Sequence, residues 1–219
     1  MAEDPTAASL AAIEVAARAE LDAKHAARER ALADSRALIR TCAIAIRAVH
    51  RHEFDQAAAL VAEARAAALR LADDLAPHPD LYWTGYVQDA LKEYVEACCV
   101  YRAVRGEPLP TPAELGVAAA AFLNGLGEMV GELRRYVLDL LRRDADPARG
   151  EQLLALMDEV YSLLVTLDYP DALTGALRRT TDSVRGIVER TRGDLTTALR
   201  QRTLAAALER LEARLPPLA

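Results

Sequence analysis

Apolar residues recur at steps of three and four positions along most of the chain, which is the period of an amphipathic helix. The longest such segment covers residues 7–52 and contains no glycine or proline. It is either one very long helix or two helices joined without a clear break. No sustained alternation of apolar and polar residues lies between turn signals, as a strand would require. The pattern therefore predicts an all-α protein.

Prolines, glycines and capping residues divide the remainder of the chain. They predict further helices over residues 55–76, 81–105, 112–143, 147–167 and 171–213. Thr111 is placed to cap the helix over 112–143, with Pro112 at its first position. Several glycines inside that helix indicate close approach of another backbone. The last helical region has possible breaks at Gly186 and Gly193.

Composition fits this helical pattern, since hydrophobic residues make up 52% of the chain and aromatic residues only 5%. We expect a single domain over residues 1–219, built from six or seven mostly long antiparallel helices, with frayed ends at 1–6 and 215–219. The three cysteines include an adjacent pair, which is not a disulfide framework. They indicate a reducing compartment, and no secretory signal is recognisable at the start. A cytoplasmic location is therefore expected.

The net charge of −6 argues against a general nucleic-acid binder, although the distribution of charge decides that question. Arginines follow the polar side of the segment 7–52. They either pair with the interspersed acidic residues or form a strip that contacts nucleic acid. Both readings stay open from the sequence.

Two groups of carboxylates stand out from the ordinary polar faces. Asp89, Glu93 and Glu96 lie at helical spacing on one face, and Glu128 and Glu132 lie four residues apart on another helix. Either both faces are solvated, or they converge on a divalent cation. Carboxylate oxygens suit Mg²⁺ or Mn²⁺, and the absence of a Glu-x-x-His motif argues against a di-iron site.

These segments resemble motifs of the translin/TRAX family. The segment Tyr86-Val-Gln-Asp-Ala-Leu-Lys-Glu-Tyr-Val-Glu-Ala97 resembles the family motif Gly-Leu-Gln-Glu-Tyr-Val-Glu-Ala, on its TRAX side. The segment Phe122-Leu-Asn-Gly-Leu-Gly-Glu-Met-Val-Gly-Glu-Leu133 resembles the second acidic motif, Tyr-Leu-Leu-Gly-Val-Ala-Asp-Leu-Thr-Gly-Glu-Leu. The order of the helices and the segment Met157-Asp-Glu-Val-Tyr-Ser162 also agree with the family pattern, so the resemblance covers most of the chain.

The resemblance implies a translin-like α-bundle with Mg²⁺-dependent endoribonuclease activity. Glu93 and Glu96 match the first pair of family catalytic acids, and Glu132 matches the last. Glu128 stands where the TRAX motif has aspartate, and the extra methylene displaces a metal ligand. All four are predicted to hold Mg²⁺ or Mn²⁺ and to orient the attacking water. Asp89 has no counterpart in the motif and is expected to support the ligands from outside.

The resemblance also implies binding of single-stranded RNA or DNA inside an octameric barrel of identical chains. Arginines in the lumen would then contact phosphates, without sequence preference and with strong salt dependence. The candidates are Arg36, Arg40, Arg47, Arg134 and Arg135.

Other functions stay open beside nuclease activity. One is a nucleic-acid-binding oligomer without catalysis, as the translin side of the family implies, and another is a helical interaction scaffold. Trp83 stands beside Tyr82 and Tyr86 at a helix start, where it either packs or stacks on bases. The four histidines lack zinc spacing and are expected to be surface or packing residues.

Overall fold

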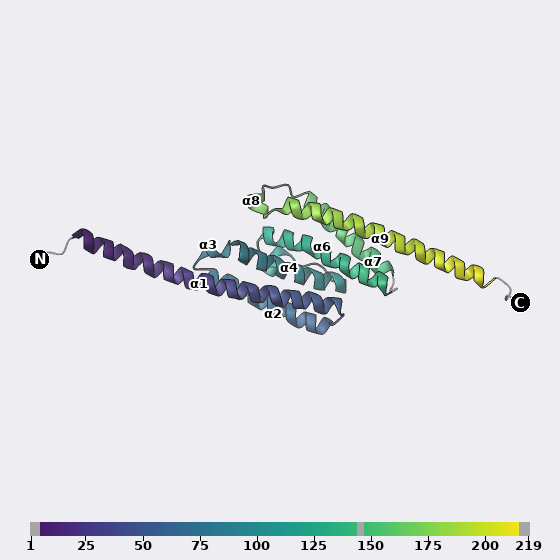
Figure 1. Ribbon diagram of the computed structural model, residues 1–219, viewed down its shortest axis with the longest axis horizontal. Coiled ribbons are helices and arrows are strands. Elements are labelled where there is room, and N and C mark those ends of the chain that lie inside the picture. The colour runs from purple at the N-terminus through teal and green to yellow at the C-terminus, as the bar shows by residue number, and fades with distance from the viewer. Residues whose placement is uncertain (1–4, 144–146, 215–219) are drawn as a thin grey trace.

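The computed structural model describes residues 5–143 and 147–214, and within these ranges the chain is helical and contains no strand (Figure 1). This confirms the all-α prediction. The described helices are α1 (Pro5–His50), α2 (Phe54–Leu75), α3 (Pro79–Tyr82), α4 (Gly85–Arg105), α5 (Pro112–Leu115), α6 (Ala119–Arg142), α7 (Pro147–Val165), α8 (Asp171–Thr174) and α9 (Leu177–Glu212). Six of them are long, and α3, α5 and α8 each span four residues.

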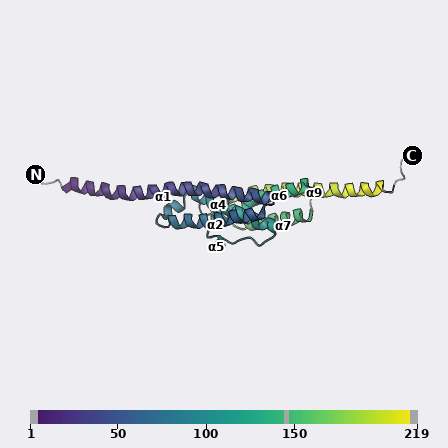
Figure 2. The ribbon, with the colours of Figure 1, turned by 90° about the horizontal axis from the view of Figure 1, so that it is seen from below.

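Four long helices form a continuous row in the order α1, α4, α6, α9, each packed on the next. Helix α2 packs on α1 and α4, and α7 packs on α6 and α9, which gives the row a second layer (Figure 2). Figure 1 shows that the four helices of the row run in the same direction, while α2 and α7 run back. Consecutive long helices are therefore antiparallel, except that the connection over 106–118 makes α4 and α6 parallel.

Two predicted helices are each divided by a turn. The segment predicted over 81–105 consists of α3 and α4, separated at Trp83 and Thr84. The segment predicted over 112–143 is divided after α5, where Gly116 adopts a left-handed φ of 68° that ends a helix. Thr111 and Glu114 form the capping box of α5, so the predicted cap is correct but begins a short helix. Gly186 and Gly193 do not interrupt α9.

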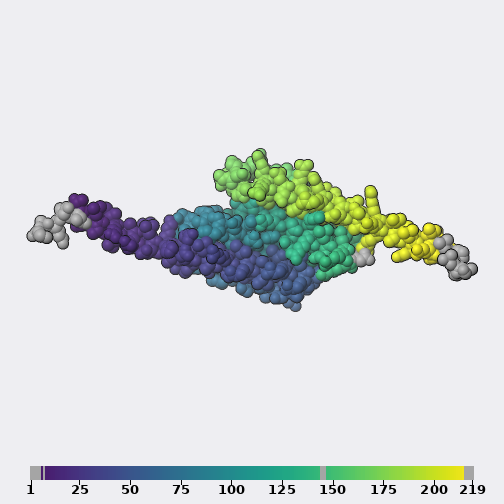
Figure 3. Space-filling view, in the orientation of Figure 1, coloured from purple at the N-terminus to yellow at the C-terminus, as the bar shows by residue number. Residues whose placement is uncertain are grey.

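The N-terminal part of α1 and the C-terminal part of α9 extend from opposite ends of the body (Figure 3). Segment 7–52 is thus mainly one helix, and α1 begins at Pro5, so Pro5 and Thr6 are helical rather than frayed. The expected fraying of residues 1–4 and 215–219 lies outside the described residues. Both extensions carry exposed apolar side chains: Leu10, Ile13, Val15 and Leu21 on α1, and Leu204, Leu208 and Leu211 on α9. No helix in the described part of the chain is both long and apolar enough to span a membrane.

Helix α4 lies at the centre of the core. Its buried residues include Leu91, Tyr94 and Val95. All three cysteines are buried and unbonded, and burial raises the pKa of the Cys98 thiol to about 12. The thiols therefore act as small apolar side chains.

Gly125 permits the close contact between α4 and α6. A Cβ added there would lie 2.5 Å from the carbonyl oxygen of Lys92 and 2.8 Å from Cβ of Val95. The expected close approach of a backbone is therefore real at this position. At Gly131, one and a half turns further along, an added Cβ would lie 4.0 Å from its nearest neighbour, Cδ1 of Ile187.

Gly125→Ala is expected to lower the free energy of unfolding by about 2–3 kcal/mol, because the added methyl forces α4 and α6 apart. Gly131→Ala is the matched control, and it should change stability little or raise it by up to about 1 kcal/mol through helix propensity. Urea unfolding of the two variants measures the difference. Equal stability of the two would contradict the packing assigned to Gly125.

Candidate metal centre and nucleic-acid interface

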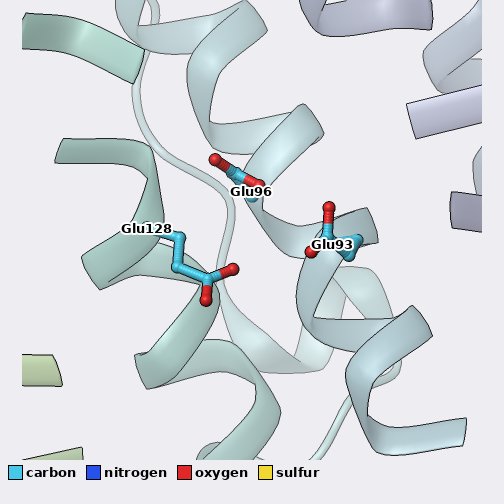
Figure 4. Close-up of side chains that lie close together, drawn as sticks. All are labelled: Glu93, Glu96 and Glu128. Carbon is cyan, nitrogen blue, oxygen red and sulfur yellow. The ribbon is translucent and has the colours of Figure 1, made fainter. Parts of the chain in front are cut away.

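Three glutamates from two helices converge where α4 and α6 pack together. Glu93 and Glu96 project from α4 and Glu128 from α6 (Figure 4). Each offers a carboxylate oxygen, and these three oxygens lie within 4.8 Å of one another. The spacing of three residues places Glu93 and Glu96 on the same side of α4. Gly125 lies one turn before Glu128 and sets the short distance between the helices.

Burial makes this cluster electrostatically unusual. Glu96 is only 8% exposed, and burial, followed by repulsion from the neighbouring carboxylates, raises its pKa to about 8. The pKa of Glu93 is also raised, first by partial burial and then by Glu128. Lys92 offsets part of the negative charge, with Nζ 2.7 Å from Oε1 of Glu128. The cluster therefore holds more negative charge than its protein neighbours neutralise.

Glu132 lies beside the cluster but is engaged elsewhere. Its Oε2 lies 2.5 Å from Nε2 of His50 at the end of α1, and 3.6 Å from Nη1 of Arg135. The contact with His50 lowers the pKa of Glu132, so this carboxylate is ionised at neutral pH. Glu132 does not belong to the group of three converging oxygens.

His50 is a site residue that the sequence did not reveal. It was expected to be an ordinary surface or packing histidine, but it is buried and contacts a predicted catalytic acid. Its Nδ1 is buried and has no hydrogen-bond partner among the described residues. The two residues are 82 positions apart in the chain, so no local motif links them.

Asp89 is exposed and lies one turn before Glu93. It is outside the group of converging oxygens, although its charge acts on both Lys92 and Glu93. A supporting role of Asp89 therefore stays a prediction.

Helix α9 supplies one wall of the site. A pocket of about 610 Å³ is lined by Glu93, Glu96 and Glu128 and, from α9, by Arg179 and Ser183. Arg179 is exposed, and within residues 5–143 and 147–214 it forms no ion pair. The sequence pointed to arginines of the first helix and of α6 and missed Arg179, because only tertiary packing brings α9 to the carboxylates.

The predicted arginines fall into two groups. Arg36, Arg40 and Arg47 are exposed on α1, and no ion pair engages them in the part of the chain that is described. Arg134 instead pairs with Asp194 on α9 at 2.8 Å, and Arg135 lies beside Glu132. The guanidinium of Arg134 therefore links α6 to α9.

The donor set of the cluster fits a hard divalent cation. All converging ligand atoms are carboxylate oxygens, the type that Mg²⁺ and Mn²⁺ prefer. Their partial burial disfavours three negative charges in the absence of a cation. Glu93, Glu96 and Glu128 are the residues that could hold it.

The raised pKa of Glu96 makes the metal-free protein sensitive to pH. The pKa rises from an ordinary 4.5 to about 8 on folding, so the folded state binds more protons than the unfolded chain between these values. Stability should therefore fall as pH rises through this window. Glu96→Gln removes the cost of ionising this buried carboxyl group. Its free energy of unfolding relative to wild type should therefore increase by about 1–3 kcal/mol as the pH rises from about 5 to about 9.

Urea unfolding in EDTA at several pH values measures this gain. Glu151→Gln changes an exposed glutamate on α7 and should follow the wild-type profile. A stability difference between Glu96→Gln and wild type that does not vary with pH would contradict the raised pKa.

Comparisons with known proteins place the chain among translin-type proteins, although no family model matches it. It is 31% identical over 194 residues to an uncharacterized protein of Methanocaldococcus jannaschii, covering 86% of this chain and 84% of that protein. This chain is similar to the crystal structure of AfC3PO, with 32% sequence identity and a TM-score of 0.79. The match covers 85% of this chain and 97% of AfC3PO. AfC3PO in a complex with duplex RNA gives a TM-score of 0.75 at 32% identity, covering 85% and 96% of the two chains.

Apo-NeC3PO has the same fold, with a TM-score of 0.75 at 20% identity, covering 90% of this chain and all of NeC3PO. The 32% identity with AfC3PO confirms the sequence resemblance at the level of the family. With 32% identity over nearly the whole length of AfC3PO, this chain belongs to the translin family.

Proposed function

We propose that this protein is a TRAX-like endoribonuclease that depends on Mg²⁺ or Mn²⁺. The observation that supports the proposal is the convergence of Glu93, Glu96 and Glu128 within 4.8 Å in a pocket that reaches the surface. A partly buried group of like charges is unfavourable unless a cation compensates it, so a purely structural role would not favour this arrangement.

The four glutamates have different parts in the proposed site. Glu93, Glu96 and Glu128 would hold the cation, and Glu132 adds an ionised carboxylate next to them, oriented by His50. A bound divalent cation would supply a more acidic water and positive charge for the phosphate at which cleavage occurs. Glu128 has one more methylene than the aspartate of the TRAX motif. Its ion pair with Lys92 restricts the position of the longer side chain beside the cluster.

Positive charge near the pocket supports RNA as the ligand. Arg179 lines the carboxylate pocket and can contact a phosphate next to the reacting one. The exposed arginines Arg36, Arg40 and Arg47 add a basic strip along α1. One of the similar structures is AfC3PO in a complex with duplex RNA, so we extend the expected ligand from single strands to RNA in either form.

A second candidate is RNA or DNA binding without cleavage. Lys92 pairs with Glu128, and His50 pairs with Glu132, so two of the four carboxylates already have cationic or hydrogen-bonding partners. Such pairs allow the fold to exist without a metal ion. Cleavage assays separate the two candidates.

We also propose that the protein assembles from identical copies, with an octamer as the expected form. The apolar side chains on the extensions of α1 and α9 have little cover from the described residues, and Leu10, Ile13 and Leu204 are each at least 60% exposed. Exposed apolar surface of this extent favours association. Assembly would place the carboxylate pockets of several copies around one enclosed RNA.

Glu96→Gln is expected to lower RNA cleavage by at least about 100-fold, because one ligand oxygen loses its charge. RNA binding should change less than about threefold, since the substitution leaves the arginines intact. Cleavage of labelled single-stranded and duplex RNA with Mg²⁺, with Mn²⁺ and with EDTA tests this. Glu151→Gln should cut like wild type.

Two results would contradict this proposal. One is cleavage that persists in EDTA, and the other is a Glu96→Gln variant that cuts at the wild-type rate. If neither wild type nor variant cuts while both bind RNA, the binding function without catalysis is the correct one.

Arg179→Ala is expected to weaken RNA binding about three- to tenfold at low salt. It should also reduce the slope of the logarithm of the binding constant against the logarithm of the salt concentration by about one unit. Arg70→Ala, which changes an exposed arginine on α2, is the matched control and should bind like wild type. Fluorescence anisotropy of labelled RNA over a series of salt concentrations measures both. Equal salt slopes for Arg179→Ala and wild type would remove Arg179 from the interface.

A further inference from the structure

A second pocket opens directly beside the carboxylate pocket. It has a volume of about 640 Å³ and lies between the start of α4, the start of α6 and helix α8. Glu128 and Thr180 line both pockets, so the two spaces adjoin. Lys92 also lines the second pocket, with its ammonium on Glu128. A ligand that spans both pockets would pass over Glu128.

An exposed indole forms part of the wall of this pocket. Trp83 is 61% exposed, so its indole is accessible from the pocket although it also packs against the ring of Tyr82. Tyr82 contacts it edge to face, with ring centroids 5.1 Å apart and planes at 87°, which leaves a face of the indole uncovered by Tyr82. Leu173 of α8 lines the same pocket and is 68% exposed. Flat apolar surface of this kind suits stacking of a planar ring.

Two polar side chains that line the pocket, Asp89 and Gln88, leave hydrogen-bond acceptors free. Asp89 is exposed, and its carboxylate forms no ion pair in the described part of the chain. Gln88 donates through Nε2 to the carbonyl oxygen of Tyr82 at 2.8 Å, which leaves its Oε1 as an acceptor. Asn124, in contrast, is fully engaged, because it donates to the carbonyls of Ala120 and Thr174 and accepts from Thr180. Asn124 therefore holds the pocket wall and does not select a ligand.

We propose that this second pocket is a nucleobase subsite that selects a base carrying an amino group. The inference rests on the proposed nuclease function, since the base would belong to the nucleotide next to the phosphate at the carboxylates. Trp83 stacks on the ring, and Asp89 accepts a hydrogen bond from the exocyclic amine. Cytosine offers such a donor at N4, whereas uracil presents an acceptor oxygen at the same position.

The chain contains one tryptophan, so its fluorescence reports directly on this pocket. Titration of the full-length protein with cytidine 5′-monophosphate is expected to quench Trp83 saturably. Uridine 5′-monophosphate should bind about tenfold more weakly, because it faces Asp89 with an acceptor. Inorganic phosphate alone should cause no quenching. Asp89→Asn should reduce the difference between the two nucleotides to less than about threefold.

Variants separate stacking from general surface effects. Trp83→Ala should weaken binding of cytidine 5′-monophosphate about tenfold in calorimetry, and Trp83→Phe should restore most of it. Tyr169→Ala is the matched control, since Tyr169 is also 61% exposed but lies outside this pocket, and it should bind like wild type.

Failure of the subsite and failure of the nuclease function give different results. If RNA is cut but both nucleotides bind equally, or Trp83→Ala binds like wild type, the subsite is wrong and the nuclease proposal stands. If cytidine 5′-monophosphate binds as expected but no RNA is cut, the subsite stands and the nuclease proposal falls. Quenching by inorganic phosphate alone would also overturn the subsite, because it would identify an anion site.

Discussion

The close packing of α4 against α6 at Gly125 is the contact on which the candidate site depends. Without a side chain there, the backbone of α6 lies against the carbonyl of Lys92 and the side chain of Val95. Glu93 and Glu96 on α4 then meet Glu128 on α6 across a short gap. This buried contact keeps the two helix backbones close enough for the three carboxylates to meet.

This packing creates an electrostatic conflict as well as a site. Glu96 is buried among like charges and has a pKa raised to about 8, whereas Glu132 has a lowered pKa because His50 contacts it. Two carboxylates on the packed helices α4 and α6 thus prefer opposite protonation states in neutral solution. Lys92 compensates only Glu128 directly. A hard divalent cation would resolve the remaining excess of negative charge, and this is the physical basis of the proposed activity.

The row of helices α1, α4, α6 and α9 carries different chemistry on its successive members. The carboxylates lie in the middle of the row, Arg179 lies on α9, and exposed arginines follow α1. The start of α4 adds the pocket with Trp83, next to the carboxylates. The extended ends of α1 and α9 keep their apolar side chains away from this arrangement and leave them available to other copies.

The sequence alone determined the helical class and most helix positions, because these depend on local periodicity and spacing. It also singled out two acidic motifs, without deciding whether they meet. It also predicted a close approach at the glycines of α6, although only Gly125 contacts a neighbouring backbone, while Gly116 ends a short helix. Tertiary structure alone decided which acids converge, since Glu132 turns to His50, a residue 82 positions away. It also brought Arg179 to the carboxylates and left Trp83 exposed beside them. Contacts between distant segments depend on the relative placement of whole helices, and no local pattern encodes that placement.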